Sequence, residues 1–118
     1  MADCDLSSLQ ETLLDFARER DWQQFHAPKN LAMALSVEAA ELMEHFQWLD
    51  EAQSRMLAAE KKQAVSLEMA DIFIYLLRLA TELEVDLLAA VKEKIEINAR
   101  KYPAERVRGS AKKYTEYE

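Results

Sequence analysis

The amino-acid sequence predicts an all-α protein, for three reasons. The long stretch between Pro28 and Pro103 contains no glycine or proline, the residues that most often interrupt a helix. It is rich in alanine, leucine, glutamate, lysine and methionine, which favour helices. No segment alternates polar and apolar residues as a strand would. The chain has 118 residues, of which 50% are hydrophobic and 31% are charged, as is typical of one globular domain.

The first predicted helix covers residues 8–20. Its start is predicted by Ser8 followed three residues later by Glu11, a pattern typical of a capping box. Its apolar residues recur with helical spacing and would form one buried face: Leu6, Leu9, Leu13 and Phe16. An aromatic loop, residues 21–27, follows.

The second predicted helix begins at Pro28, because proline suits the first turn of a helix, and runs to Trp48. A short helical piece is then expected from Asp50, which can cap it together with Gln53, to about residue 59.

The third predicted helix, residues 61–83, is apolar on most sides and is therefore expected at the centre of the protein. Asp86 can cap a fourth helix that ends at Lys101, ahead of Pro103. Because one partner helix could not cover the apolar surface of residues 61–83, we expect an antiparallel helical bundle completed by oligomerisation.

Two regions are expected on charge: a helical domain, residues 1–103, and a basic C-terminal tail, residues 104–118, that is extended or mobile. The tail contains Arg106, Arg108, Lys112 and Lys113. It could close over an anionic substrate, or it could only make the protein more soluble.

Several functional classes are disfavoured. The formal net charge of −7 at pH 7 argues against a nucleic-acid partner. The longest uninterrupted apolar run, residues 72–77, is too short to cross a membrane. The N-terminus lacks a signal-peptide pattern, and the single cysteine, Cys4, fits a reducing compartment. We therefore expect a cytoplasmic protein.

Two pairs of carboxylates carry the chemistry, Glu38-x-x-Glu41 and Glu68-x-x-Asp71. On a helix, residues three apart share a face. The second pair interrupts an apolar stretch, where an uncompensated buried carboxylate would cost several kcal/mol, roughly. Oxygen ligands of this kind suit Mg²⁺ or Mn²⁺. For Glu38 and Glu41 alone, a solvated helix face is an equally good interpretation. A di-iron bundle is disfavoured because neither histidine follows a glutamate by three residues.

Further candidates fall on the same helices and the loop. Trp48 and Tyr75 would end the two acidic stripes, where they could pack in the core or flank a nucleotide base. Trp22 lies in a polar loop and is a poor core residue. Lys94 and Asn98 share one face of the fourth predicted helix and could bind phosphates.

Several segments extend these patterns: Arg20-Asp21-Trp22-Gln23-Gln24-Phe25-His26, Phe46-Gln47-Trp48, Asp71-Ile72-Phe73-Ile74-Tyr75-Leu76, Lys94-x-x-x-Asn98-x-x-Lys101-Tyr102-Pro103, and Arg108 to Glu116. With them, the chain resembles the MazG-like all-α nucleoside triphosphate pyrophosphohydrolases, and among these the dCTP pyrophosphatases. The resemblance covers about residues 8–116. It implies a homotetramer, with active sites at subunit contacts, that hydrolyses dCTP or a modified dCTP to the monophosphate and pyrophosphate with Mg²⁺.

The resemblance also implies roles for single residues. The metal would be held by Glu38, Glu41, Glu68 and Asp71. In the mechanism that we expect, one of these acids is the general base, and Glu41 is our candidate, although the spacing of the acids does not decide among them. The nucleoside would be contacted by Trp22, Trp48 and Tyr75, and the phosphates or sugar by Lys94 and Asn98. The chain departs from the animal members of the family at Leu13, where they have a histidine. The alternative is a non-catalytic helical module that binds nucleotides or a partner helix.

Overall fold

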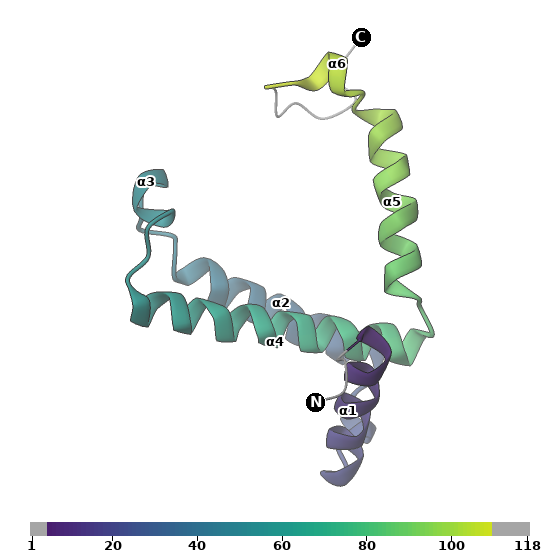
Figure 1. Cartoon of the computed structure of the whole chain (residues 1–118). Helices are drawn as coiled ribbons and strands as arrows, with labels where there is room; N and C mark the ends of the chain where they lie inside the picture. The colour runs from purple at the N-terminus through teal and green to yellow at the C-terminus, as the bar shows by residue number, and fades with distance from the viewer. Residues whose placement is uncertain (1–4, 110–118) are drawn as a thin grey trace. The chain divides into compact units, whose positions relative to one another are not determined.

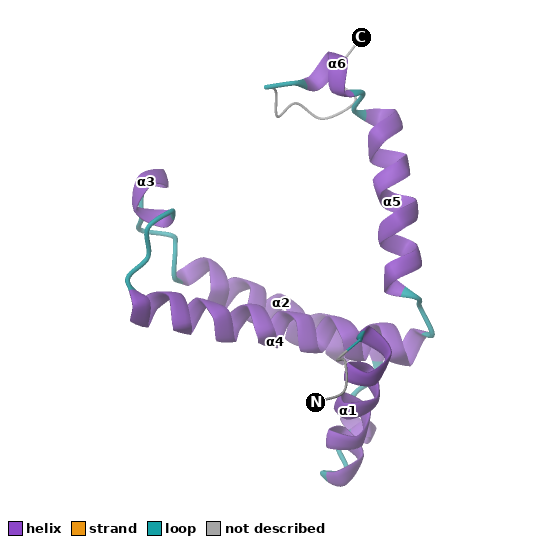
Figure 2. Ribbon diagram, viewed as in Figure 1, coloured by secondary structure: helices purple, strands orange, loops and turns teal. Residues whose placement is uncertain are grey.

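The computed structural model describes residues 5–109, and all regular structure in this part of the chain is helical (Figures 1 and 2). The all-α prediction is confirmed. The elements are α1 (Leu6–Glu19), the 3₁₀ helix η1 (Gln23–Phe25), α2 (Pro28–Glu44), α3 (Glu51–Ser54), α4 (Ala59–Leu83), α5 (Leu87–Lys101) and α6 (Ala104–Val107). The chain divides into two compact units, Met1–Glu84 and Val85–Glu118.

The first unit is built on the pair α2 and α4, which run side by side in opposite directions (Figure 1). Helix α4 also contacts α1, so its predicted central position is confirmed. The connection between the paired helices passes through the short α3. The apolar side chains that are buried in this unit come from α1, α2 and α4: Ala17, Leu31, Val65, Leu77 and Ala80.

Helix α1 begins at Leu6, earlier than expected, because Asp5 and not Ser8 is its N-cap. The Asp5 carboxylate accepts a hydrogen bond from the Ser8 backbone N–H at 2.7 Å. The predicted capping box of Ser8 and Glu11 is therefore wrong. An ionised carboxylate is a stronger acceptor than a hydroxyl and also interacts favourably with the positive end of the helix, which explains the choice of Asp5.

Helix α2 ends at Glu44 and not at Trp48. Beyond this point most of the backbone bonds join residues three apart instead of four: the N–H of His45 donates to the carbonyl of Leu42 at 3.2 Å, and that of Phe46 to the carbonyl of Met43 at 2.9 Å. These bonds tighten the chain into turns. Trp48 consequently does not continue the face of α2 that carries Glu38 and Glu41.

The expected caps of the later helices are present. Asp50 and Gln53 form a capping box, although α3 ends at Ser54, well before residue 59. The Asp86 carboxylate accepts a hydrogen bond from the backbone N–H of Ala89 at 3.1 Å, which caps α5. Part of the segment expected to be extended forms α6. The rest of the tail, including Lys112 and Lys113, lies outside the described residues.

The paired helices carry many large apolar side chains that face solvent. Between 45% and 59% of each of these is exposed in the protomer: Met33, Val37, Leu67, Met69 and Phe73. An open apolar groove of about 390 Å³ lies between Leu42 on α2 and Met69, Ile72, Phe73 and Leu76 on α4. Among the described residues, no helix is both long and apolar enough to span a bilayer.

Candidate metal centre and adjoining pocket

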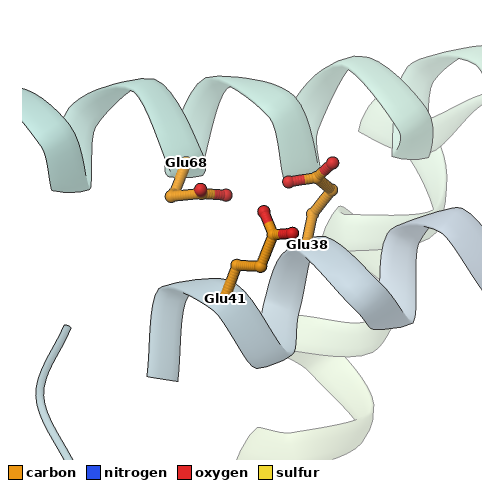
Figure 3. Close-up of side chains that lie close together, drawn as sticks. All are labelled: Glu38, Glu41 and Glu68. Carbon is orange, nitrogen blue, oxygen red and sulfur yellow. The ribbon is translucent and has the colours of Figure 1, made fainter. Parts of the chain in front are cut away.

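Three carboxylates from two helices converge in the first unit. Glu38 and Glu41 project from one face of α2, and Glu68 projects toward them from α4 (Figure 3). Each of the three offers an oxygen, and these oxygens all lie within 4.8 Å of one another. Because α2 and α4 are packed together, the i, i+3 spacing on α2 brings two acids against the third. We call Glu38, Glu41 and Glu68 the acid cluster.

The acid cluster is electrostatically strained. The pKa of Glu38 is raised to about 7, first by its hydrogen bond with Glu68, then by burial and by the hydrogen bond and negative charge of Glu41, and also by Asp71. One oxygen of Glu38 and one of Glu68 are buried without a hydrogen-bond partner. Buried acceptors are usually satisfied. Oxygens without a donor, on acids that repel one another, fit a divalent cation.

Asp71 lies one turn beyond Glu68 on α4 and is exposed. It is near enough to contribute to the raised pKa of Glu38 through its charge. Asp71 also forms part of the wall of a neighbouring pocket. It therefore connects the acid cluster to that pocket.

We call this second feature the aromatic pocket. It has a volume of about 140 Å³ and is bounded by α1, the loop after it and α4, with the lining residues Leu13, Phe16, Ala17, Trp22, His26, Asp71, Ile74, Tyr75 and Arg78. Pockets for drug-sized ligands usually measure roughly 300–1,000 Å³. The aromatic pocket is therefore suited to a single small ring and not to a whole nucleotide.

The end of α1 positions Trp22. Asp21 adopts a left-handed conformation with φ 54°, which turns the chain back on the helix. The N–H of Trp22 then donates to the carbonyl of Ala17 at 2.9 Å, and the N–H of Asp21 donates to that of Arg18 at 3.0 Å, as in a Schellman motif. The indole packs edge-to-face on Phe16, with ring centroids 5.8 Å apart. Trp22 is thereby held at the rim of the pocket.

Arg78 is the buried polar residue of the pocket wall, with only 2% of its surface exposed. Its Nε–H donates to Nδ1 of His26 at 3.3 Å, and its Nη2 forms an ion pair with Glu82 at 3.2 Å. Its Nη1 is buried without a partner. Burial, with the nearby charge of Arg78, lowers the pKa of His26. Sequence reasoning missed Arg78, although a single cation among apolar residues, three after Tyr75, was a usable signal.

The other candidate residues are placed as follows. Trp22 and Tyr75 line the same pocket as Asp71. Trp48 follows the end of α2 and is 87% exposed, so it does not line this pocket in the protomer. Lys94 and Asn98 are exposed on α5, which belongs to the second unit. The roles of all these residues remain predictions.

Fold and site together define a class, an all-helical protein with a candidate cation centre beside a small aromatic pocket. The profile of the MazG-like family matches residues 33–117. dCTP pyrophosphatase 1 from Homo sapiens is 42% identical over 113 residues, which are 94% of this chain, and the protein of that name from Rattus norvegicus is 43% identical over the same length. The chain covers 66% of the human relative's length. The chain belongs to the MazG-like family.

A solved structure supports the same fold. The crystal structure of a pyrophosphatase from Archaeoglobus fulgidus superimposes with a TM-score of 0.80 and 39% sequence identity. The match covers 87% of this chain and 96% of the archaeal chain. The resemblance seen in the sequence motifs is therefore confirmed at the level of family and fold.

Proposed function

We propose that the chain is a Mg²⁺-dependent nucleoside triphosphate pyrophosphohydrolase that converts dCTP, or a modified dCTP, to the monophosphate and pyrophosphate. The names of its relatives support this activity. The observation that carries the proposal is the convergence of three carboxylate oxygens within 4.8 Å, beside a ring-sized aromatic pocket.

The acid cluster and Asp71 would hold the metal. All four residues offer the hard oxygen ligands that Mg²⁺ and Mn²⁺ prefer. Two of the oxygens are buried and lack a hydrogen-bond donor, which supports a cation as their partner. When bound, such an ion neutralises the negative charge of the triphosphate and lowers the pKa of the attacking water.

The residues of this chain then divide the remaining tasks. Glu41 takes the proton of the attacking water as general base. Attack at the α-phosphorus breaks its bond to the bridging oxygen, and pyrophosphate leaves. The base enters the aromatic pocket between Trp22 and Tyr75, because stacking on aromatic rings binds any base by roughly 1–3 kcal/mol. Asp71, which lines this pocket, keeps the nucleoside next to the acids.

Residues outside the pocket would act through the assembly. We propose a homo-oligomer, a tetramer by the resemblance to the family, in which subunit contacts complete the active sites. The exposed apolar side chains of α2 and α4 support an oligomer. In it, Trp48 would contact the nucleoside across a subunit contact, and Lys94 and Asn98 would bind the phosphates or sugar.

The test is release of pyrophosphate from dCTP with saturating Mg²⁺. Glu41→Gln should lower kcat by about 10²–10⁴-fold, the range for a general acid or base, and leave the helical content unchanged. The matched control is Glu44→Gln, because Glu44 is an exposed glutamate on α2 outside the acid cluster and should keep full activity.

Two results would contradict the proposal. A Glu41→Gln variant that keeps its activity would show that Glu41 is not the general base. Tight binding of dCTP and Mg²⁺ by calorimetry, with no pyrophosphate from any nucleotide in a panel of the common triphosphates, would instead identify the non-catalytic binding module.

A further inference from the structure

Arg78 has more hydrogen-bonding capacity than its protein contacts use. A guanidinium can only donate, and it has five N–H groups in a fixed fork. Nε and Nη2 are engaged by His26 and Glu82, while the buried Nη1 has no partner. A purely structural arginine at this depth would have its donors satisfied, because buried polar groups almost always are. The unpartnered donor on a pocket wall points to a ligand acceptor.

The same contact fixes the proton on His26. Because Arg78 donates to Nδ1 of His26, that nitrogen must accept, and the proton of the neutral imidazole lies on Nε2. The lowered pKa of His26 keeps the ring neutral near pH 7. His26 also lines the aromatic pocket, and its Nε2–H would be a second donor to a ligand there. The wall of the pocket thus offers donors from both Arg78 and His26.

The order of residues on α4 matches the order of groups in a nucleotide. Asp71, Tyr75 and Arg78 all line the pocket. With a rise of 1.5 Å per residue, Arg78 lies about 10 Å along the helix from Asp71. That span is comparable to a nucleoside measured from its 5′ oxygen to the far edge of its base. A ligand with phosphates at Asp71 would stack its base near Tyr75 and direct the base edge toward Arg78.

We propose that Arg78, with His26, is the specificity-determining residue of this pocket and donates hydrogen bonds to the O2 and N3 acceptors of a cytosine ring. This inference rests on the proposed function for the identity of the ligand. Cytosine presents O2 and N3 as adjacent acceptors, whereas N3 of uracil or thymine carries a hydrogen that would oppose a donor. A purine ring system is disfavoured by the small volume of the pocket, about 140 Å³.

The kinetic test compares dCTP with dUTP, which differ at N3 and at position 4 of the ring. Arg78→Met should lower the ratio of kcat/KM for dCTP to that for dUTP by roughly ten- to a hundredfold, the loss expected for a hydrogen bond from a charged donor. The matched control is Arg18→Met, because Arg18 is an exposed arginine of α1 that pairs only with Asp15 among the described ion pairs. It should leave the ratio unchanged.

A structural role for Arg78 predicts a different result. If Arg78 only ties His26 to α4, the substitution would weaken both substrates equally, and an unchanged ratio would overturn the proposal. Arg78→Lys, which keeps the charge but not the fork, should fail to restore the preference.

A second measurement separates this inference from the proposed function. Deoxycytidine without metal is titrated into the wild-type protein while the NMR signals of the Arg78 Nε–H and the His26 ring are followed. Shifts with deoxycytidine that exceed those with deoxyuridine support the inference even if no triphosphate is hydrolysed. Absence of such a difference would overturn it, whether or not the enzyme is active and whether or not Arg78→Met folds.

Discussion

The pKa of Glu38 lies near neutral pH, so its carboxyl keeps its proton at acidic pH values where most surface glutamates are already ionised. Its pKa rises from 4.5 in a reference peptide to about 7, chiefly because Glu68 shares a hydrogen bond with it. Between these pH values Glu38 binds more protons in the folded protein than in the unfolded chain. Its contribution to the free energy of unfolding therefore falls as pH rises through this window. The contribution of Glu38 is fully present below about pH 4.5 and is lost above about pH 7.

This behaviour can be tested with urea denaturation of metal-free protein at several pH values. The difference in free energy of unfolding between wild type and Glu38→Gln should decrease steadily from pH 4.5 to pH 7. The comparison is needed because His26, whose pKa is lowered, has the opposite sign and removes stability as pH falls below 6.5. That term cancels between the two proteins. Parallel profiles would contradict the assignment of the raised pKa to Glu38.

For single residues, the sequence predicted the carboxylates of the acid cluster but not the hydrogen-bond donor Arg78. The i, i+3 spacing was sufficient to place Glu38 beside Glu41 and to predict a meeting with Glu68. Arg78 was not predicted as a site residue, because its place in the pocket depends on a contact with the loop residue His26, which lies 52 positions away in the chain. Trp48 was placed wrongly on the face of α2, since the early end of this helix depends on turn bonds that hydrophobic periodicity does not encode.

Among the elements, the short α3 depends most on its cap. It has only four residues, and its start is held by the reciprocal bonds of Asp50 and Gln53, at 2.7 and 2.9 Å. A helix this short gains few backbone hydrogen bonds beyond its first turn, so they contribute little to its stability. Loss of an N-cap aspartate costs about 0.5–2 kcal/mol.

We therefore expect Asp50→Ala to open α3 locally while α2 and α4 stay paired. Hydrogen exchange at the Gln53 amide should become several-fold to about thirtyfold faster, which corresponds to that cost. Asp50→Asn keeps an acceptor and should change the exchange rate little. Equal effects of the two substitutions would mean that charge, and not the cap, holds α3.

The helices themselves were the most predictable part of the molecule, for a physical reason. Continuous helix-forming composition and two aspartate caps, Asp50 and Asp86, depend on local interactions that are visible in the sequence. The start of α1 was missed because Asp5 and Ser8 both suit an N-cap, and only the folded geometry decides between them. The short α6 was missed because a single helical turn leaves no periodic pattern.

The part of the protomer that the structure describes, residues 5–109, buries few apolar side chains for its length. Residues such as Met69 and Phe73 of α4 expose about half of their surface and flank an open apolar groove. Burying this surface against a second copy would add stability in proportion to the area covered. Oligomerisation was expected from the apolar character of this helix, and it remains a prediction.

If a second copy covers this groove, stability must depend on protein concentration. We expect the Tm to rise as protein concentration increases, and sedimentation to show a single oligomer at micromolar concentration. Met69→Glu should dissociate the assembly, because it would bury an unpaired charge at the contact. Lys62→Glu is the control, an exposed charged position near the start of α4. A wild-type protein that sediments as a monomer, with a Tm independent of concentration, would refute this prediction.

The raised pKa of Glu38 has a consequence for how the acid cluster would take up a cation. Below about pH 7, a divalent cation that binds the oxygen atoms of the acid cluster must displace the proton of Glu38, so metal binding becomes an exchange of one ion for another. Acidification then competes directly with the metal, and the heat of filling includes the ionisation of whatever buffer receives the proton. The occupancy of the acid cluster would thus follow the acidity of the surroundings as well as the supply of metal.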